Sequence, residues 1–370
     1  MIRFECDYNE GAHERILQRL METNLEQTSG YGTDAHCERA RMLIRQACDH
    51  EEADVHFLVG GTQTNTTVIA SILRPHQGVI AAVSGHIAVH ETGAIEAAGH
   101  KVLTVPSLDG KITATQVRAV YDAHAQESSP EHSVQPGMVY ISQPTENGTM
   151  YSKAELEALY AVSQACDLPF FIDGARLGYA LASRDCDMTM ADLARLCDVF
   201  YIGGTKIGAL MGEAVVILKD ALKRDFRYII KQKGGLLAKG RLLGIQFETL
   251  FEDGLYLDIS RHAVDMALRI HDTLEQQGVE FLYASPTNQQ FPVLPNGLLE
   301  QLREHYTFTF WEKVDDSRSA VRFCTSWATR QENVDALTHD IVKLLQKNDN
   351  QVQIAEAAEP FAELQTAAMV

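Results

Sequence analysis

The sequence has no closely spaced pair of cysteines. Its seven cysteines are scattered over 370 residues, their number is odd, and no two of them have the C-x-x-C spacing. A disulfide framework or a cysteine-bound zinc site needs regularly spaced pairs, so neither is expected to organise this chain. Dispersed, reduced thiols of this kind are typical of a cytoplasmic protein.

Positive charge and long apolar runs are also scarce. The chain carries 32 lysines and arginines against 50 acidic residues, which leaves a net charge of −18. Nucleic acids and anionic membranes bind basic surfaces, so we expect neither as a partner. No apolar run approaches the roughly 18 residues of a membrane span, and the first residues lack a signal-peptide core. These absences predict a soluble cytoplasmic protein.

Two glycine-rich segments come close to nucleotide-binding motifs without matching them. The segment GGTQTN at 60–65 lacks the G-x-G-x-x-G spacing of dinucleotide-binding folds. The segment GLLAKG at 235–240 has the glycine spacing of a P-loop, but Arg241 and Leu242 replace the required Lys and Ser or Thr. Neither class of nucleotide-binding protein is therefore supported.

The chain does have seven short apolar segments that are typical of buried strands. Helix-length segments with amphipathic spacing, such as 153–166, separate most of them. The predicted strands are Val55–Val59, Val79–Val83, Lys101–Val105, Met138–Ser142, Pro169–Ile172, Asp198–Ile202 and Ala214–Leu218. This alternation predicts an α/β fold with a mostly parallel seven-stranded sheet between helices.

The pattern changes beyond about residue 235. Longer helices are followed by the apolar segments FPVLP, YTFTF and AVRFCTSW and by a helix over 333–345, which indicates a smaller α+β domain. We predict four regions along the chain. They are an N-terminal segment 1–12, a large domain 13–248, a small C-terminal domain 249–350 and a tail 351–370.

Polar residues follow five of the predicted strands. Parallel strands joined by right-handed crossovers end at the same edge of a sheet, where ligands bind in open α/β folds. These groups are Gly60–Asn65, Ser84–His86, Gln143–Gly148, Asp173–Arg176 and Gly203–Lys206. The sequence therefore predicts a site at this edge.

Two of these groups have both an ordinary and a functional interpretation. The 60–65 turn is either a plain strand-to-helix connection with Thr62 as the helix cap, or a phosphate site at the helix N-terminus. Lys206 is either a solvated lysine or a desolvated one at the sheet edge. Desolvation lowers the pKa of a lysine and exposes the neutral amine that Schiff-base chemistry requires.

The charged groups are similarly open to two interpretations. Asp173 either caps a helix and pairs with Arg176, or holds a proton on the nitrogen of a cofactor ring. His86 and His90 are four residues apart and share a helix face, which makes them the best metal candidates in the chain. No third ligand is evident, so we predict no metal.

The combination favours pyridoxal 5′-phosphate (PLP) as the cofactor. A helix N-terminus can bind its phosphate, a carboxylate can keep its pyridine nitrogen protonated, and a lysine can bind its aldehyde. Three of the predicted groups at the sheet edge supply these functions in the order GGTQTN, IDGAR and GGTK.

The chain resembles the threonine aldolase family of fold type I PLP enzymes. The resemblance is carried by GGTQTN, SGHIAVHETGA, FFIDGARLGYAL and YIGGTKIGAL, and it extends from about Phe4 to Leu345. The opening FECDYNEGAHERIL is similar to the start of that family. The pair IDGAR and GGTK is the most specific part of the resemblance.

The resemblance implies a role for each matching residue. Lys206 is the lysine that binds the cofactor covalently, and Asp173 is the partner of the pyridine nitrogen. Arg176 contacts the ring oxygen side. His86 stacks on the ring and acts near the reacting hydroxyl group.

The resemblance also implies how the phosphate is held. Gly61 and Thr62 bind it within one chain, and Lys239 or Arg241 reaches the phosphate of a neighbouring subunit. The active site therefore lies at a subunit interface, in a homodimer or homotetramer.

Four further residues are implied in substrate binding. Arg322 binds the substrate carboxylate by a bidentate pair, and Tyr31 lines the shared cleft. Two positions depart from the family. Cys6 stands where the family usually has Ser, and Glu146 replaces a His that some members have near the substrate hydroxyl.

The implied activity is that of a carbon–carbon lyase. It cleaves L-threonine, L-allo-threonine or a related β-hydroxy-α-amino acid to glycine and an aldehyde. An alternative with the same cofactor is another fold type I reaction, such as β-elimination. Two alternatives of other classes are a non-catalytic binding module on the same fold and zinc hydrolysis through His86 and His90.

Overall fold

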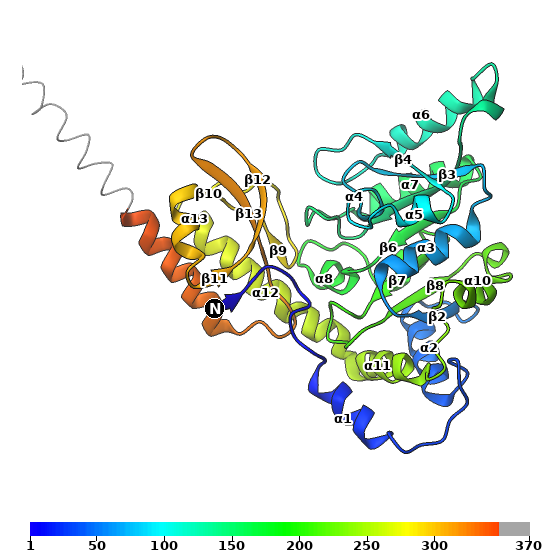
Figure 1. Cartoon of the computed structure of the whole chain (residues 1–370), viewed down its shortest axis with the longest axis horizontal. Coiled ribbons are helices and arrows are strands. Elements are labelled where there is room, and N and C mark those ends of the chain that lie inside the picture. The colour runs from blue at the N-terminus through cyan, green and yellow to red at the C-terminus, as the bar shows by residue number, and fades with distance from the viewer. Residues whose placement is uncertain (348–370) are drawn as a thin grey trace, which may run out of the picture.

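The computed structural model describes residues 1–347 of the chain. The predicted tail 351–370 lies outside the described residues. Figure 1 shows a larger α/β part and a smaller part joined by one long helix. Among the described residues no helix is both long and apolar enough to cross a membrane.

A seven-stranded sheet forms the centre of the larger part, in the order β2-β8-β7-β6-β5-β3-β4. Its strands are β2 (Asp54–Leu58), β3 (Gln77–Ala82), β4 (Lys101–Val105), β5 (Gln135–Ser142), β6 (Phe170–Asp173), β7 (Val199–Gly203) and β8 (Glu213–Ile217). Only β8 runs antiparallel to its neighbours β2 and β7. The predicted mostly parallel seven-stranded sheet is therefore confirmed.

Both faces of this sheet are buried, which explains its continuous apolar strands. In β6, Phe170 and Ile172 pack into one core while Phe171 packs into the other. A strand that alternates its side chains between two covered faces needs apolar residues at every position. The predicted strand Lys101–Val105 matches the observed one, and the ends of the other six lie within three residues of the observed ends.

Helices cover each face of the sheet. The core on one face includes side chains of α3 (Gly61–Ile72), α4 (His86–Val89), α5 (Ala94–Ala97) and α10 (Phe226–Gln232). The other face is covered by α1 (Glu14–Glu22), α2 (Ala35–Ala47), α6 (Ala114–Ala125), α7 (Lys153–Ala165), α8 (Leu177–Ala182), α9 (Met190–Ala194) and α11 (Arg241–Phe251).

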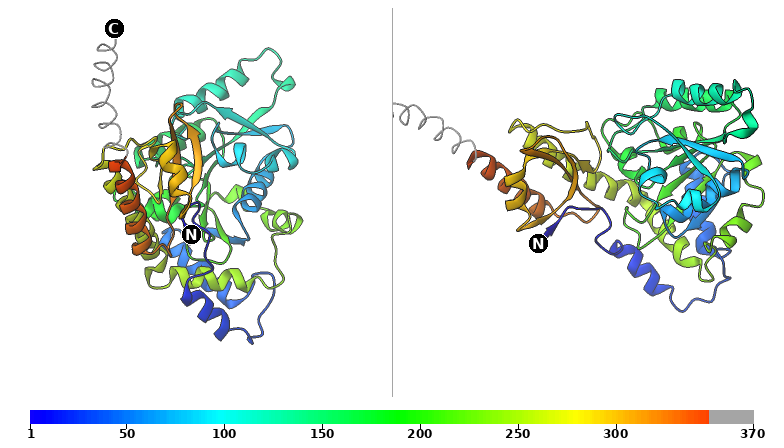
Figure 2. Two further views of the ribbon diagram at one scale, coloured as in Figure 1. Left: turned by 60° about the vertical axis from the view of Figure 1, so that its left-hand side comes forward. Right: turned by 45° about the horizontal axis from the view of Figure 1, so that its top comes forward.

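The smaller part has its own core and sheet. Its strands are β9 (Gln289–Gln290), β10 (Val293–Pro295), β12 (Thr309–Lys313) and β13 (Arg318–Cys324), with β13 pairing to the other three. Helix α13 (Asn296–Leu302) and a last helix over 331–347 pack against this sheet. Figure 2 shows these elements from two further directions.

Two segments connect the larger and smaller parts. Helix α12 (Leu255–Glu275) contributes Tyr256 and Ile259 to the large core and Ile270 and Leu274 to the small one. The N-terminal strand β1 (Ile2–Arg3) pairs with β11 (Tyr306–Thr307) of the smaller part. These two connections hold the smaller part next to the carboxyl edge of the large sheet, where the predicted site residues lie.

Candidate active site

A cavity of about 550 Å³ lies at the carboxyl edge of the sheet, between the two parts of the molecule. Eight of the residues predicted from the sequence line it. They are Gly61, Thr62, His86, Glu146, Asp173, Arg176, Lys206 and Arg322. Segments far apart in the chain therefore meet at one site.

Asp173 ends β6 and is buried at the base of the cavity. Four donors hold its carboxylate: the Tyr140 hydroxyl at 2.6 Å, the Tyr201 hydroxyl at 2.5 Å, the Asn65 amide at 3.0 Å and the Ala175 N–H at 3.0 Å. Burial alone would raise the pKa of this carboxyl, but the neighbouring His86 charge and the hydrogen bonds outweigh it and lower the pKa. The cavity therefore has a fixed negative charge at its base.

Lys206 follows β7 through a turn that only glycine fits. A Cβ on Gly203 would lie 2.2 Å from the Ala175 carbonyl oxygen, and one on Gly204 would lie 2.7 Å from the Gly212 carbonyl oxygen. This tight turn carries Lys206 into the cavity, where burial and the Arg176 charge lower the pKa of its amine. A lysine with a lowered pKa is more readily a nucleophile.

Helix α3 begins at the cavity without a side-chain cap. Its N-cap residue is Gly60, and no side chain accepts a hydrogen bond from the first turn. The interpretation of Thr62 as the helix cap is therefore wrong, since Thr62 lies inside the helix. The uncapped N–H groups of this twelve-residue helix suit an anion.

His86 begins α4 and is oriented by two buried side chains. Its Nδ1 lies 2.8 Å from Glu91 Oε1, which also accepts a hydrogen bond from the Asn65 amide at 2.7 Å. A carboxylate only accepts, so Nδ1 donates and Nε2 stays available as an acceptor. Burial opposes protonation of His86, yet the bond to Glu91 and the Asp173 charge raise its pKa.

Glu146 lies beside His86 on the cavity wall and is partly buried. A single oxygen, Oε1, accepts hydrogen bonds from the Ser142 hydroxyl at 2.6 Å and from the His86 backbone N–H at 3.0 Å. These bonds do not offset the cost of burying the charge, and burial raises the pKa of this carboxyl.

Arg176 pairs with Asp7 and not with Asp173, so the predicted alternative of an Asp173–Arg176 ion pair is wrong. Its Nε and one terminal nitrogen donate to the two oxygens of Asp7 at 2.7 and 3.0 Å. Burial opposes ionisation of Asp7, but the Arg176 and Lys206 charges lower its pKa to about 2. The bidentate pair fixes the guanidinium at the cavity wall.

Arg322 reaches the cavity from β13 of the smaller part. Its terminal nitrogens donate to the Glu5 carbonyl at 2.9 Å and to Gln289 Oε1 at 3.2 Å, and its guanidinium lies 5.6 Å from the centre of the Trp311 ring. Its Nε is buried and has no partner. This cation faces the lysine and carboxylate of the larger part across the cavity.

Four predicted residues do not line this cavity. The Cys6 thiol donates to Asn9 Oδ1 at 3.1 Å. Arg241 donates to backbone carbonyls of residues 23–26. Tyr31 has a positive φ of 59° and stacks under Lys231, and Lys239 is exposed. The site within one chain is thus built without these four side chains.

Sequence reasoning missed several residues that hold the site. The side chains of Asn65, Glu91, Tyr140 and Tyr201 form the hydrogen-bond network beneath the cavity. Asn65 lies one turn into the helix that GGTQTN opens, and Glu91 follows the histidine pair, so both had a sequence signal. The two tyrosines are indistinguishable from core residues in an apolar strand.

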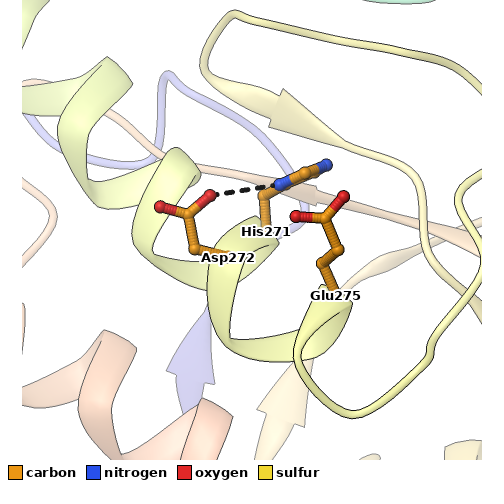
Figure 3. A group of neighbouring side chains, drawn as sticks. All are labelled: His271, Asp272 and Glu275. Atoms are coloured by element: carbon orange, nitrogen blue, oxygen red, sulfur yellow. Dashed lines mark hydrogen bonds and ion pairs between the residues drawn. The ribbon is translucent and has the colours of Figure 1, made fainter.

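The described residues offer one group of three side chains at metal-binding distance, and it lies elsewhere. It consists of His271, Asp272 and Glu275 on α12 (Figure 3), of which the two acids are exposed. His86 and His90 are not part of such a group, and Glu91 occupies Nδ1 of His86. The geometry therefore gives no support to zinc hydrolysis at the cavity.

Comparison with solved structures identifies the class of protein. A Leishmania major threonine aldolase superposes with a TM-score of 0.91 and is 44% identical, covering 93% of this chain and all of that one. A Thermus thermophilus aspartate aminotransferase superposes with a TM-score of 0.66 at 13% identity over 93% of this chain and 91% of its own, which shows the fold alone. The fold and the lysine–carboxylate site define a fold type I PLP-dependent lyase.

Sequence comparison identifies the family. The family model described as beta-eliminating lyase matches residues 8–367. A low specificity L-threonine aldolase of Pseudomonas sp. (strain NCIMB 10558) is 30% identical over 92% of this chain and 96% of its own, and one of Pseudomonas aeruginosa is 29% identical with the same coverage. The chain belongs to the threonine aldolase family.

Proposed function

We propose that this chain binds PLP and cleaves L-threonine, L-allo-threonine or a related β-hydroxy-α-amino acid to glycine and an aldehyde. The observation that carries the proposal is the shared cavity of Lys206, Asp173 and Arg322, three residues that come from both parts of the molecule. Similarity to threonine aldolases over more than nine tenths of the chain supports the same reaction.

The residues present fit PLP at each of its polar groups. The uncapped first turn of α3, with Gly61 and Thr62, suits the phosphate. The Asp173 carboxylate is held ionised at the cavity base and suits the protonated pyridine nitrogen. Lys206 lines the same cavity and supplies an amine whose pKa is lowered by burial.

When bound, the cofactor supplies an electron sink for the pair released at the substrate Cα. Arg322 binds and orients the substrate carboxylate, using the fork of a guanidinium that already points into the cavity. His86 accepts the β-hydroxyl proton at Nε2, because its Nδ1–H is committed to Glu91. Arg176, fixed by Asp7, adds a permanent positive charge at the wall.

β-Elimination is a second candidate, and the match to the beta-eliminating lyase family favours it. It would use the same lysine and carboxylate but would release a 2-oxo acid and ammonia instead of glycine and an aldehyde. Product analysis separates the two reactions directly.

We also propose a homodimer or homotetramer in the cytoplasm. Tyr31, Lys239 and Arg241 lie outside the cavity of their own chain, so a contribution to cofactor binding would have to be made to a partner's site. Seven free cysteines agree with a reducing compartment.

The test combines labelling with product analysis. Borohydride reduction of the loaded protein followed by peptide mapping should place a pyridoxyl group on Lys206. Incubation with threonine and allo-threonine should then yield glycine and acetaldehyde. A Lys206→Ala variant that still became labelled and cleaved threonine at an undiminished rate would refute the assignment. A 2-oxo acid and ammonia as the products would establish β-elimination instead.

A further inference from the structure

Glu213 is a buried carboxyl in the cavity that the proposed mechanism does not use. It is the first residue of β8 and pairs with Leu58 of β2 on one side and Gly203 of β7 on the other. The chain runs from Leu58 into the turn that opens α3, and from Gly203 to Lys206. Glu213 therefore lies between the proposed phosphate site and the lysine.

The Glu213 carboxyl is not neutralised by an ion pair. Within residues 1–347, no Lys, Arg or His nitrogen lies within 4.0 Å of its oxygens, although Lys206 lines the same cavity. Its Oε2 accepts a hydrogen bond from the Gly204 N–H at 3.2 Å, and the Thr205 side chain is a second partner. Two neutral donors are weak support for a buried negative charge.

Groups on four elements face this carboxyl. The Lys206 charge, from the loop after β7, favours its ionised form, whereas Asp173 at the end of β6 opposes it. The hydroxyl groups of Tyr201 on β7 and Tyr256 on α12 also interact with it electrostatically. Burial dominates and raises the pKa of Glu213 to about 8, so at neutral pH the carboxyl carries a proton.

A phosphate monoester at the start of α3 makes this protonation functional. The phosphate carries close to two negative charges at neutral pH, and an ionised carboxylate on the wall of the same cavity would repel it. A protonated carboxyl instead offers an O–H donor, and a hydrogen bond from it to a charged phosphate oxygen is a strong one.

We propose that Glu213 binds the cofactor phosphate as the protonated acid, donating its O–H to a phosphate oxygen, so that in alkaline solution binding takes up a proton at this residue. The inference rests on the proposed function, because it assumes a phosphorylated cofactor in this cavity. It assigns a phosphate-binding role to an acidic residue, and it makes the retention of the cofactor dependent on pH.

The experiment measures binding of pyridoxine 5′-phosphate to the full chain freed of cofactor. This probe has an alcohol in place of the aldehyde, so it cannot condense with Lys206 and reports phosphate and ring binding alone. Its Kd is measured by titration between pH 7 and 9.5. We expect wild-type affinity to fall above pH 8 by up to tenfold per pH unit, with matching proton uptake in calorimetry. The Kd of Glu213→Gln should change less with pH than that of wild type, because its amide donates at every pH and only the ring nitrogen of the probe and Lys206 still titrate.

Lys206 also loses charge as the pH rises, and a second variant separates its contribution. In Lys206→Met the pH dependence and the proton uptake should persist, moved to higher pH because Glu213 has lost a neighbouring cation. Three outcomes would overturn the proposal: no proton uptake by wild type, an unchanged pH dependence in Glu213→Gln, or its loss in Lys206→Met. The ring nitrogen of the probe also takes up a proton when it binds beside Asp173, so Glu213 is reported by the share of the pH dependence and proton uptake that its substitution removes. If Glu213→Gln misfolds, Glu213→Ala, which also lacks a titrating group, gives the same comparison.

Failure of this inference is distinguishable from failure of the proposed function. A chain that binds the probe equally well at pH 7 and 9.5 keeps the proposed function and loses only the role of Glu213. A chain that binds neither PLP nor the probe at any pH contradicts the proposed function itself.

Discussion

Two carboxyl groups close to the ends of neighbouring strands have pKa values shifted in opposite directions in this cavity. Asp173, at the end of β6, is surrounded by four donors directed at both of its oxygens, and its pKa is lowered. Glu146, just beyond β5, receives two donors on one oxygen, and its pKa is raised. Asp173 is the more deeply buried of the two, yet its pKa is the one that is lowered, so burial alone does not set the direction of the shift.

The difference lies in what the surrounding chain offers. The tyrosines on β5 and β7 and the amide on α3 compensate the cost of desolvating Asp173. The negative charge of Asp173 also acts on Glu146, and together with burial it opposes the ionisation of Glu146. One cavity therefore favours the ionised form of one acid and the protonated form of the other, which is how a single site can separate a fixed counter-ion from a proton-bearing group.

The largest expected effect follows from removing the charged member of this pair. In Asp173→Asn the amide keeps the volume but cannot hold a proton on the cofactor nitrogen, so kcat should fall by roughly 10²- to 10³-fold. Steady-state rates with threonine measure this. Asp198→Asn is the matched control, since Asp198 is also a buried acid but accepts hydrogen bonds away from the cavity. An unchanged kcat in Asp173→Asn would break the comparison.

Residues of this cavity differ in how far the sequence could reveal them. Asp173 and Lys206 were predictable because each follows an apolar strand, and parallel strands present their carboxyl ends at one edge. Tyr140 and Tyr201 were not, because both faces of the sheet are buried and an apolar strand gives no sign of which aromatic side chain donates a hydrogen bond. Their roles emerge only from the pairing of β5, β6 and β7.

Strand direction explains the miss of Glu213. It precedes the predicted strand Ala214–Leu218, and a search for polar groups after parallel strands passes over it. Because β8 is antiparallel, its first residue lies at the carboxyl edge of the others. In the smaller part, YTFTF was predicted as one apolar segment. It divides between β11, which pairs with the N-terminal β1, and β12, which pairs with β13, a choice set by long-range contacts.

A smaller effect is expected at Glu91, which positions His86 without contacting substrate. In Glu91→Gln, kcat should fall about 10- to 100-fold, by analogy with other partners that orient a histidine. The bond to Glu91 raises the His86 pKa, so its loss should move the acidic limb of the kcat profile to lower pH. A purely structural role would leave that limb in place. Glu96→Gln, an exposed acid on α5, is the control.

Stability measurements sharpen the contrast between the two acids. The Glu146 pKa is raised on folding, so the folded state retains a proton above pH 4.5, and wild type loses stability as the pH rises through that window. The Asp173 pKa is lowered, so its contribution is present above pH 3.8 and is lost as the pH falls.

Denaturation of the two variants at several pH values tests these signs. Relative to wild type, Glu146→Gln should gain stability from pH 4.5 to pH 7, and Asp173→Asn should lose stability as the pH rises from below 3.8. The changes should be on the order of 1 kcal/mol. We expect Glu146→Gln to keep kcat within about tenfold, since it retains an acceptor for the Ser142 hydroxyl. Parallel pH trends in the two variants would contradict the opposite directions of the two pKa shifts.

The smallest effect is expected at Cys6. This substitution tests whether a change outside the cavity wall affects catalysis. The thiol is directed at Asn9 and does not line the cavity, although the preceding Glu5 carbonyl accepts from Arg322. A Ser hydroxyl can donate the same bond, so Cys6→Ser should change stability by no more than about 0.5 kcal/mol and kcat/KM by less than about threefold. A larger loss of kcat/KM with kcat unchanged would show that this segment positions Arg322 for the substrate carboxylate. An interaction that stabilises the bound substrate and the transition state equally changes KM and leaves kcat unchanged.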